Sequence, residues 1–300
     1  MTATALTSGA VNVPIQKLDA WLGKVQAGSS IAALSGAIPM KFGKGEAMVF
    51  DIGEAEYVGE GQAKGGTEVK DKVQKTDPFK FHKTIRMNEE VLWADEDHQL
   101  ATVEQILAQC QPALSRALDF GVFHGINPTG GTAVAAMTQK LAATTSVVTQ
   151  TVGGKPYEAL DAADALVLAN GFVPSDVALD PTFAAQFSTM RGKNSEQKLY
   201  PGFKLTTDVS ELDGHRASVS RTVGANKIAA VDTDILGVVG DFSAVRWGIQ
   251  EQIGLELIKY GDPDGLGDLK RFNQVAFRVE VVYGWGVADL DAFSLIKKGD

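Results

Sequence analysis

The chain has 300 residues, 44% of them hydrophobic and 22% charged, so it is long enough to bury a core and too apolar to be disordered throughout. Its formal net charge of −9 argues against a protein that grips duplex DNA with its whole surface, because such proteins carry a basic excess. The single cysteine, Cys110, excludes a disulfide framework or a cysteine zinc site within one chain. It lies in an apolar helical pattern, which predicts a buried thiol.

The N-terminus lacks a basic segment followed by an apolar core, so we expect no secretory signal. Apolar stretches fall short of the roughly 20 residues of a membrane helix. The sequence therefore predicts a soluble protein, made in a reducing cytoplasm and without a membrane partner.

Residues 1–45 are low in charge and rich in Ala, Gly, Ser and Thr. Apart from a short amphipathic stretch within VPIQKLDAWLGKV, they predict an extended arm. Such an arm buries little apolar surface by itself, so we expect it to lie on another surface.

Two strands are predicted on either side of the glycine-rich stretch EYVGEGQAKGGTEVKDK, residues 56–72. In FKFHKTIRM, Phe79, Phe81, Ile85 and Met87 alternate with polar residues, which is the period of a half-buried strand. The connection is far longer than a tight hairpin turn. The glycine-rich stretch is therefore predicted at the tip of a two-stranded projection.

Asn88, followed by two glutamates, is predicted to cap a helix. A stronger helix follows, with apolar residues at spacings of three and four from Leu100 to Val122. Pro112 lies inside this run, so we expect it to bend the helix or split it in two.

From residue 155 the predicted helices and strands follow one another irregularly. One helix is predicted from Pro156 to a stop at Gly171, and a second begins at Asp180 and Pro181. Later strands are predicted in WGIQEQIGLELI and NQVAFRVEVVY, where apolar residues recur with period two. This mixture, without a repeat of fixed period, indicates an α+β fold.

The glycine-rich stretch does not have the pattern of a phosphate-binding loop. Lys64 precedes Gly65 and Gly66 instead of following the glycines, and the chain continues into a strand rather than a helix. Nearby acidic residues would also repel phosphate. A flexible projection is the better interpretation.

Other patterns that could form a metal site or a catalytic site are also incomplete. DPDGLGD, residues 262–268, has Leu266 where a calcium loop needs an oxygen ligand. The four histidines show no metal-ligand spacing, and Ser218 and Ser220 near His215 are interpreted as strand residues. We therefore expect no catalytic residues, no cofactor and no metal. A soluble hydrolase whose site forms only in three dimensions stays open as an alternative.

Five stretches, in order, resemble the major capsid proteins of tailed bacteriophages of the HK97 type. They run from about Gly28 to Lys298, and Asn88 stands where that family usually has serine. The stretches are AGSSIAALSGAIPM, GEAEYVGEGQAK, KTIRMNEEVLWAD, RALDFGVFHGINPTGG and the closing pattern from GDFSAVRWG to AFSLIK.

The resemblance implies an HK97-like capsid fold. Its parts would be an N-terminal arm over residues 1–45, a peripheral domain over 46–154, an axial domain over 155–270 and a return to the peripheral domain over 271–300. Within the peripheral domain it implies an extended loop at about 52–76 and a long spine helix at about 98–123.

The resemblance also implies a structural subunit of an icosahedral phage head, which self-assembles in the host cytoplasm into hexamers and pentamers and encloses double-stranded DNA without sequence-specific binding. Implied partners are a portal protein, a decoration protein as a further candidate, and a separate scaffolding protein unless an N-terminal segment has been removed. An encapsulin-like nanocompartment shell that encloses enzymes stays open as an alternative.

Contacts between subunits are implied for the extended loop, at Glu56, Tyr57, Val58, Glu60, Lys64, Glu68 and Lys70. Some relatives join a loop lysine covalently to an asparagine of a neighbour. The candidates for such a bond here are Lys64, Lys70 and Lys72 with Asn273.

Overall fold

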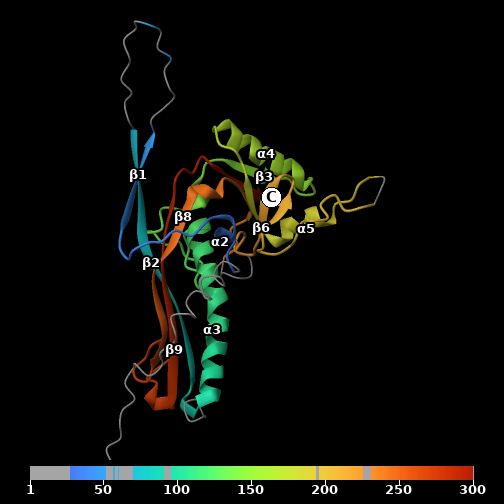
Figure 1. The fold of residues 1–300 in the computed structure, drawn as a ribbon. Helices are drawn as coiled ribbons and strands as arrows, with labels where there is room; N and C mark the ends of the chain where they lie inside the picture. Colours follow the sequence, from blue (N-terminus) through green and yellow to red (C-terminus); the bar gives the residue numbers. More distant parts are fainter. Residues whose placement is uncertain are drawn as a thin grey trace, which may run out of the picture.

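The computed structural model describes residues 28–51, 57, 60, 70–90, 96–193, 196–225 and 231–299. They form two sheets with helices packed against them, which confirms the predicted α+β class (Figure 1). The strands are β1 (Gly45–Asp51), β2 (Lys70–Asn88), β3 (Val147–Gln150), β4 (Asp176–Leu179), β5 (Ser210–Leu212), β6 (His215–Val219), β7 (Ile235–Gly240), β8 (Val245–Ile258), β9 (Gln274–Val287) and β10 (Phe293–Lys298). The helices are α2 (Ser30–Leu34), α3 (Glu96–Asp119), α4 (Pro156–Ala169) and α5 (Pro181–Thr189), with the short segments η2 (Phe120–His124), η3 (Leu141–Ala143), η4 (Phe242–Ala244) and η5 (Lys270–Phe272).

The first sheet is antiparallel, in the order β1-β2-β9-β8, and α3 runs beside it (Figure 1). As the alternation predicted, one face of β9 is apolar and buried, and the apolar residues of β2 pack against the same core. Phe81 lies opposite Val281, and Ile85 lies opposite Phe277. This pairing of apolar residues fixes the register, because a slip of one residue would turn them away from the core.

Strand β8 keeps its apolar face through two irregularities. The register shifts between Ile249 and Glu251 and again between Ile253 and Glu256. One extra residue would reverse the face of every later side chain, and two extra residues restore it. Ile249, Leu255 and Leu257 therefore all pack against the core, as the period of two predicted.

Two local predictions concern the residues before and within α3. Asn88 is the last residue of β2 and pairs with Gln274, and residues 89–90 directly after it form a helical turn, while residues 91–95 lie outside the described residues. Pro112 does not split α3, which continues to Asp119 and then into η2. Pro112 lies close to Gly28 of the arm, so the helix is packed against another segment at this point.

The second sheet has six strands in the order β3-β10-β7-β4-β6-β5 and packs against α4 and α5. Both helices begin as predicted, with Pro156 and Pro181 in their first turns. Asp180 caps α5 by accepting a hydrogen bond of 2.8 Å from the Thr182 amide. The sequence ranges of the two sheets interleave: β8 belongs to the first sheet, whereas β3 and β10 belong to the second.

Candidate contact surfaces

A long hairpin of β1 and β2 projects from the molecule (Figure 1). The pairing runs from Gly45 opposite Thr76 to Asp51 opposite Lys70, after which β2 pairs with β9 from Asp77 onward. β1 is an edge strand of its sheet. The hairpin thus offers a surface that its own core does not cover, and exposed edges of this kind readily contact another chain.

The residues proposed for intersubunit contact are only partly described. Tyr57 has 92% of its surface exposed, and Glu60 is also exposed. Lys70 begins β2 opposite Asp51. Glu56, Val58, Lys64 and Glu68 lie outside the described residues. A fully exposed tyrosine on a projection is typical of a side chain that another protein covers, because aromatic rings supply much of the energy of such contacts.

The root of the predicted arm is buried in its own chain. Ile31 and Leu34 of α2 belong to the main core, and Ser29 caps this short helix by accepting a hydrogen bond from the Ala32 amide. This corrects the expectation that the whole arm depends on another surface. Two apolar residues, spaced for a single helical turn, suffice to insert residues 29–35 between α3 and the second sheet.

Asp119, the last residue of α3, joins the arm root to the rest of the molecule. Its carboxylate accepts hydrogen bonds from the Ser29 hydroxyl, the Ser30 amide at 3.0 Å, the Ile31 amide at 3.2 Å and the Thr222 hydroxyl. Burial raises the pKa of Asp119, and the hydrogen bonds from Ser29 and Thr222 oppose this rise. A buried carboxylate is tolerated only when its oxygens are satisfied, so these segments are held together as a unit.

Beyond α2, the arm crosses the first sheet over two glycines. Gly248 of β8 and Gly284 of β9 lie opposite each other. A Cβ atom at Gly248 would lie 2.3 Å from the Ile38 carbonyl oxygen, and one at Gly284 would lie 2.9 Å from the Met40 sulfur. The arm is also tied to β8, since the Ile38 amide donates to the Trp247 carbonyl at 2.8 Å. Glycine is required at Gly248 because the backbone of the arm approaches the sheet so closely there, whereas at Gly284 the near atoms belong to the Gln250 and Met40 side chains.

The loop between β8 and β9, which contains DPDGLGD, is organised by an arginine. The Arg86 guanidinium bonds to the carboxylates of Asp262 and Asp264 and donates to the Gly267 carbonyl at 2.8 Å. This partner lowers the pKa of the Asp264 carboxyl. Within the part of the chain that the structure describes, no group of three His, Cys, Asp or Glu side chains is arranged to hold a metal ion.

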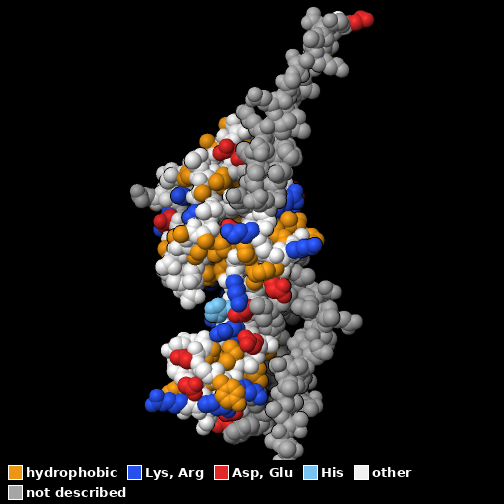
Figure 2. Space-filling model, turned by 90° about the vertical axis from the view of Figure 1, so that its left-hand side faces the viewer, with side chains coloured by type: hydrophobic (Ala, Val, Ile, Leu, Met, Phe, Trp, Pro, Cys, Tyr) orange, Lys and Arg blue, Asp and Glu red, His pale blue; other side chains and the backbone are white. Residues whose placement is uncertain are grey.

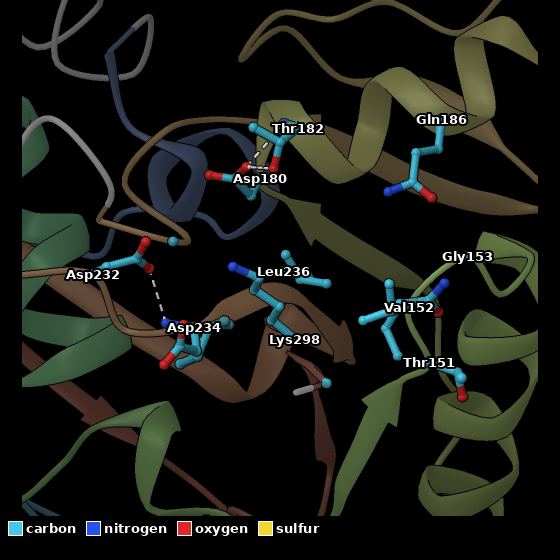
Figure 3. A pocket seen from close by; sticks show the side chains of 14 residues that line it. Thr151, Val152, Gly153, Asp180, Thr182, Gln186, Asp232, Asp234, Leu236 and Lys298 are labelled. Carbon is cyan, nitrogen blue, oxygen red and sulfur yellow. Dashed lines mark hydrogen bonds between the residues drawn. The ribbon is translucent and has the colours of Figure 1, made fainter.

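A groove of about 430 Å³ opens where β3, β7 and β10 approach the start of α5 (Figure 3). Two of the carboxylates that line it have structural roles: Asp180 caps α5, and Asp232 accepts a hydrogen bond of 3.0 Å from the Asp234 amide. Other polar residues of the lining include Gln150, Gln186 and Lys298. The groove contains no serine, cysteine or histidine that would form a nucleophile and base pair.

The reactive side chains considered in the sequence are also accounted for. Cys110 is buried, as predicted, and burial raises the pKa of its thiol. His124 donates to the Thr222 carbonyl at 2.9 Å, and burial lowers its pKa to about 4. His215 bonds to Asp164 at 3.1 Å, whereas Ser218 bonds to the Thr207 carbonyl at 2.9 Å.

The sequence indicated the hairpin but not the roles of Asp119 and the two glycines. Asp119 offered one signal, a charge within an apolar helical run, and it lies in the RALDFG part of a stretch used for the resemblance. Gly248 and Gly284 carried no signal in the sequence. The arm residues that approach them, Ile38 and Met40, lie more than 200 residues earlier in the chain.

The model of the phage capsid family matches residues 9–298, so the chain belongs to this family. Similar solved structures include chains from Mycobacterium phage Ogopogo (40% identity, TM-score 0.77, covering 91% of this chain and 93% of that chain) and from Gordonia phage Cozz (28% identity, TM-score 0.70, covering 91% and 87%). A third structure, "Capsid of native GTA particle computed with C5 symmetry", is 14% identical with a TM-score of 0.56, covers 90% of each chain and supports the fold alone. No curated protein matches.

The chain is therefore a structural subunit of a phage head with an HK97-like fold, as the resemblance predicted. Membership implies self-assembly into a shell of many subunits and a location in the virion capsid. Nothing in the site geometry or the similar structures favours the nanocompartment or the hydrolase alternative. Among the described helices, none combines the length and the apolar character needed to cross a membrane.

Proposed function

We propose that the chain forms hexamers and pentamers of a closed icosahedral shell that encloses double-stranded DNA, and that the tip of the β1–β2 hairpin lies across a neighbouring subunit. The observation that carries this proposal is Tyr57, exposed on a hairpin whose β1 edge is not covered by a further strand of its own sheet. The net charge of −9 supports it as well, because an acidic shell holds DNA without adhering to it.

We further propose how the molecule divides within the shell. The first sheet, with α3, would form the peripheral domain, and the second sheet, with α4 and α5, would form the axial domain around the five-fold and six-fold axes. We base this division on the two sheets and not on sequence ranges. β8 lies in the first sheet although its residues fall in the range expected for the axial domain, and β10 lies in the second sheet although its residues fall in the range expected for the peripheral domain.

The proposal also includes three partner proteins. A separate scaffolding protein would guide assembly in the host cytoplasm, a portal protein would occupy one vertex, and a decoration protein would bind the finished shell. A covalent bond between a hairpin lysine and Asn273 would have to join different subunits, since Lys70 and Asn273 lie near opposite ends of β2.

The decisive experiment removes the hairpin tip. Deleting residues 56–72 should leave a folded subunit, measured by circular dichroism, and should abolish or distort the shells seen by electron microscopy of the chain expressed with its scaffold. The matched control is Val152→Asp, a change of an exposed residue between β3 and α4, away from the hairpin, which should assemble normally. Normal shells from the tip deletion would refute the role of the hairpin.

The contents of purified particles test the proposed cargo. Double-stranded DNA, detected by nuclease protection, is expected inside mature particles from infected cells. A folded enzyme in place of DNA would support a nanocompartment and overturn the proposed cargo.

A further inference from the structure

Helix α4 is apolar on two sides. Its inner side, which includes Leu160 and Val167, is buried against the second sheet. Its outer side also carries apolar residues, with Leu168 at 56% exposure, and Val173 just beyond the helix is 72% exposed. We call the exposed residues Ala162, Ala165, Leu168, Ala169 and Val173 the outer patch of α4. Exposed apolar side chains gathered on the outer side of a helix whose inner side is already buried indicate a surface that a partner covers in the assembled protein.

Acidic residues flank the outer patch at both ends. Asp161 is exposed on the same side of α4, seven residues before Leu168. At the other end, the side chain of Asn170 donates to the Asp291 carbonyl at 2.9 Å, which holds Asp291 beside the patch. Asp291 is exposed as well. An apolar centre with an acidic border is the usual composition of a protein contact, and it favours a basic partner surface.

A surface of the opposite character lies elsewhere on the same chain. The loop between α5 and β5, described at residues 190–193 and 196–209, exposes Leu199 at 50% together with Leu205. We call this loop the basic projection because its four basic side chains outnumber its two acidic ones. The basic side chains are Arg191, Lys193, Lys198 and Lys204, and the acidic ones are Glu196 and Asp208.

The basic projection is held in shape by its own backbone. The Leu199 amide donates to the Met190 carbonyl at 3.2 Å, and the Gly192 amide donates to the Gln197 carbonyl at 2.9 Å. The Lys204 amide donates to the Ser210 hydroxyl at 3.2 Å. Because the loop is ordered before it meets a partner, binding costs less conformational entropy than it would for a free loop.

Within one subunit the basic projection approaches the start of α4 and not the centre of the outer patch. Tyr200, at the base of the projection, lies near Tyr157 and Asp161 in the first half of α4. The outer patch is centred on the other half, and the projection leads away from it (Figure 1). Complementary surfaces at different places on one chain make head-to-tail contacts, which close into rings when the rotation between copies allows it.

We propose that the outer patch of α4 binds the basic projection of a neighbouring copy of this chain, and that this contact builds the ring of the hexamer and pentamer. The inference rests on the proposed function, since it names the partner surfaces within those rings. Leu168 and Val173 would lie against Leu199 and Leu205 of the neighbour, with Asp161 and Asp291 facing Lys198 and Lys204.

The first test breaks the apolar contact. Leu168→Asp should abolish rings in native mass spectrometry and shells in electron microscopy, while circular dichroism and thermal unfolding stay those of the wild type. Val152→Asp is the matched control, because Val152 is 72% exposed in the second sheet unit but lies outside the patch; it should assemble normally. Normal rings from Leu168→Asp would overturn the inference. If the wild type itself formed no rings, the proposed function would fall and the inference with it.

The second test identifies the partner surface. Asp161→Lys with Asp291→Lys should weaken ring formation at least tenfold, and adding Lys198→Glu and Lys204→Glu to the same chain should restore it. A double variant, Leu168→Cys with Leu199→Cys, should form disulfide-linked ladders on a non-reducing gel, whereas each single variant should not, because the native Cys110 is buried. Absence of both rescue and ladders, with Leu168→Asp still blocking rings, would show that another surface covers the patch.

Discussion

The arm root and the β1–β2 hairpin were expected to behave alike, as segments with too little apolar surface to be ordered by their own subunit. The structure separates them. The arm root inserts Ile31 and Leu34 into the core and anchors itself on Asp119. The hairpin is held by the ladder between β1 and β2 and carries Tyr57 into solvent (Figure 1). The apolar content of a segment therefore does not decide alone whether its own subunit orders it. In the arm root, one helical turn and its hydrogen bonds to the buried Asp119 anchor a segment that its composition predicts to be extended.

Figure 2 shows the side of the molecule from which the hairpin projects. Hydrophobic side chains gather across its middle, and charged side chains of both signs are mixed over its lower part. Phe42, at the end of the described arm, is largely exposed. The arm is thus buried at its root and exposed at Phe42, and the change occurs within about ten residues.

The largest effect on stability is expected from Asp119→Ala. The change leaves the donors on Ser29, Ser30 and Thr222 buried without an acceptor, which costs about 3 kcal/mol or more in the free energy of unfolding. Urea denaturation measures this loss. Asp119→Asn keeps one carbonyl oxygen as acceptor and should cost clearly less; equal stability of Asp119→Ala and the wild type would show that Asp119 does not anchor the arm.

A similar loss is expected on acidification, and it arises from His124 in η2, which bonds to the Thr222 carbonyl. Burial lowers the pKa of His124 to about 4, while an unfolded histidine has a pKa near 6.5. The unfolded chain therefore binds more protons between these values, so stability falls as pH drops through this range, by up to about 3 kcal/mol from this group. His124→Gln keeps a donor toward the Thr222 carbonyl but cannot titrate.

The measurement is the free energy of unfolding of both proteins at pH 7 and pH 4. All other titratable groups are the same in the two proteins and contribute equally to the change in the free energy of unfolding. The difference between the proteins therefore isolates His124. A wild type that loses no more stability than His124→Gln would contradict the assignment.

Gly248→Val should displace the arm without unfolding the sheet. The new side chain meets the Ile38 carbonyl, and relief of this overlap is expected to cost about 1–3 kcal/mol. Limited proteolysis should then cut the chain near residues 36–43 faster than in the wild type. Gly202→Val is the matched control: a Cβ there meets nothing within 4 Å, its backbone is not left-handed, and the change should leave the arm protected.

The smallest effect on stability is expected from Tyr57→Ser in the hairpin. The tyrosine is almost fully exposed, so the free energy of unfolding should change by less than about 0.5 kcal/mol. Assembly should nevertheless slow, as measured by light scattering with the scaffold present. A variant that assembles at the wild-type rate would restrict the contact to other residues of the tip.

Sequence predicted those elements whose signals are local. The apolar alternation of β2 and β9 and the start signals of α4 and α5 led to the right elements, and the glycine-rich stretch was correctly placed between two strands. The parallel pairing of β3 with β10 had no such signal, because the partners lie about 150 residues apart and come together only in the folded sheet. Asp119 and Gly248 were missed for the same reason: each owes its role to a segment distant in sequence.

Arg86 gives the β8–β9 loop a cation that cannot dissociate. A loop built around bound calcium would change shape whenever the particle moved between fluids of different calcium content, and a chelator would loosen it. Here the charge is tethered to β2, and its guanidinium bonds to two carboxylates and a carbonyl of the loop. A virion has no means to regulate the fluid around it, so a covalently attached cation makes the shape of this loop independent of dissolved calcium.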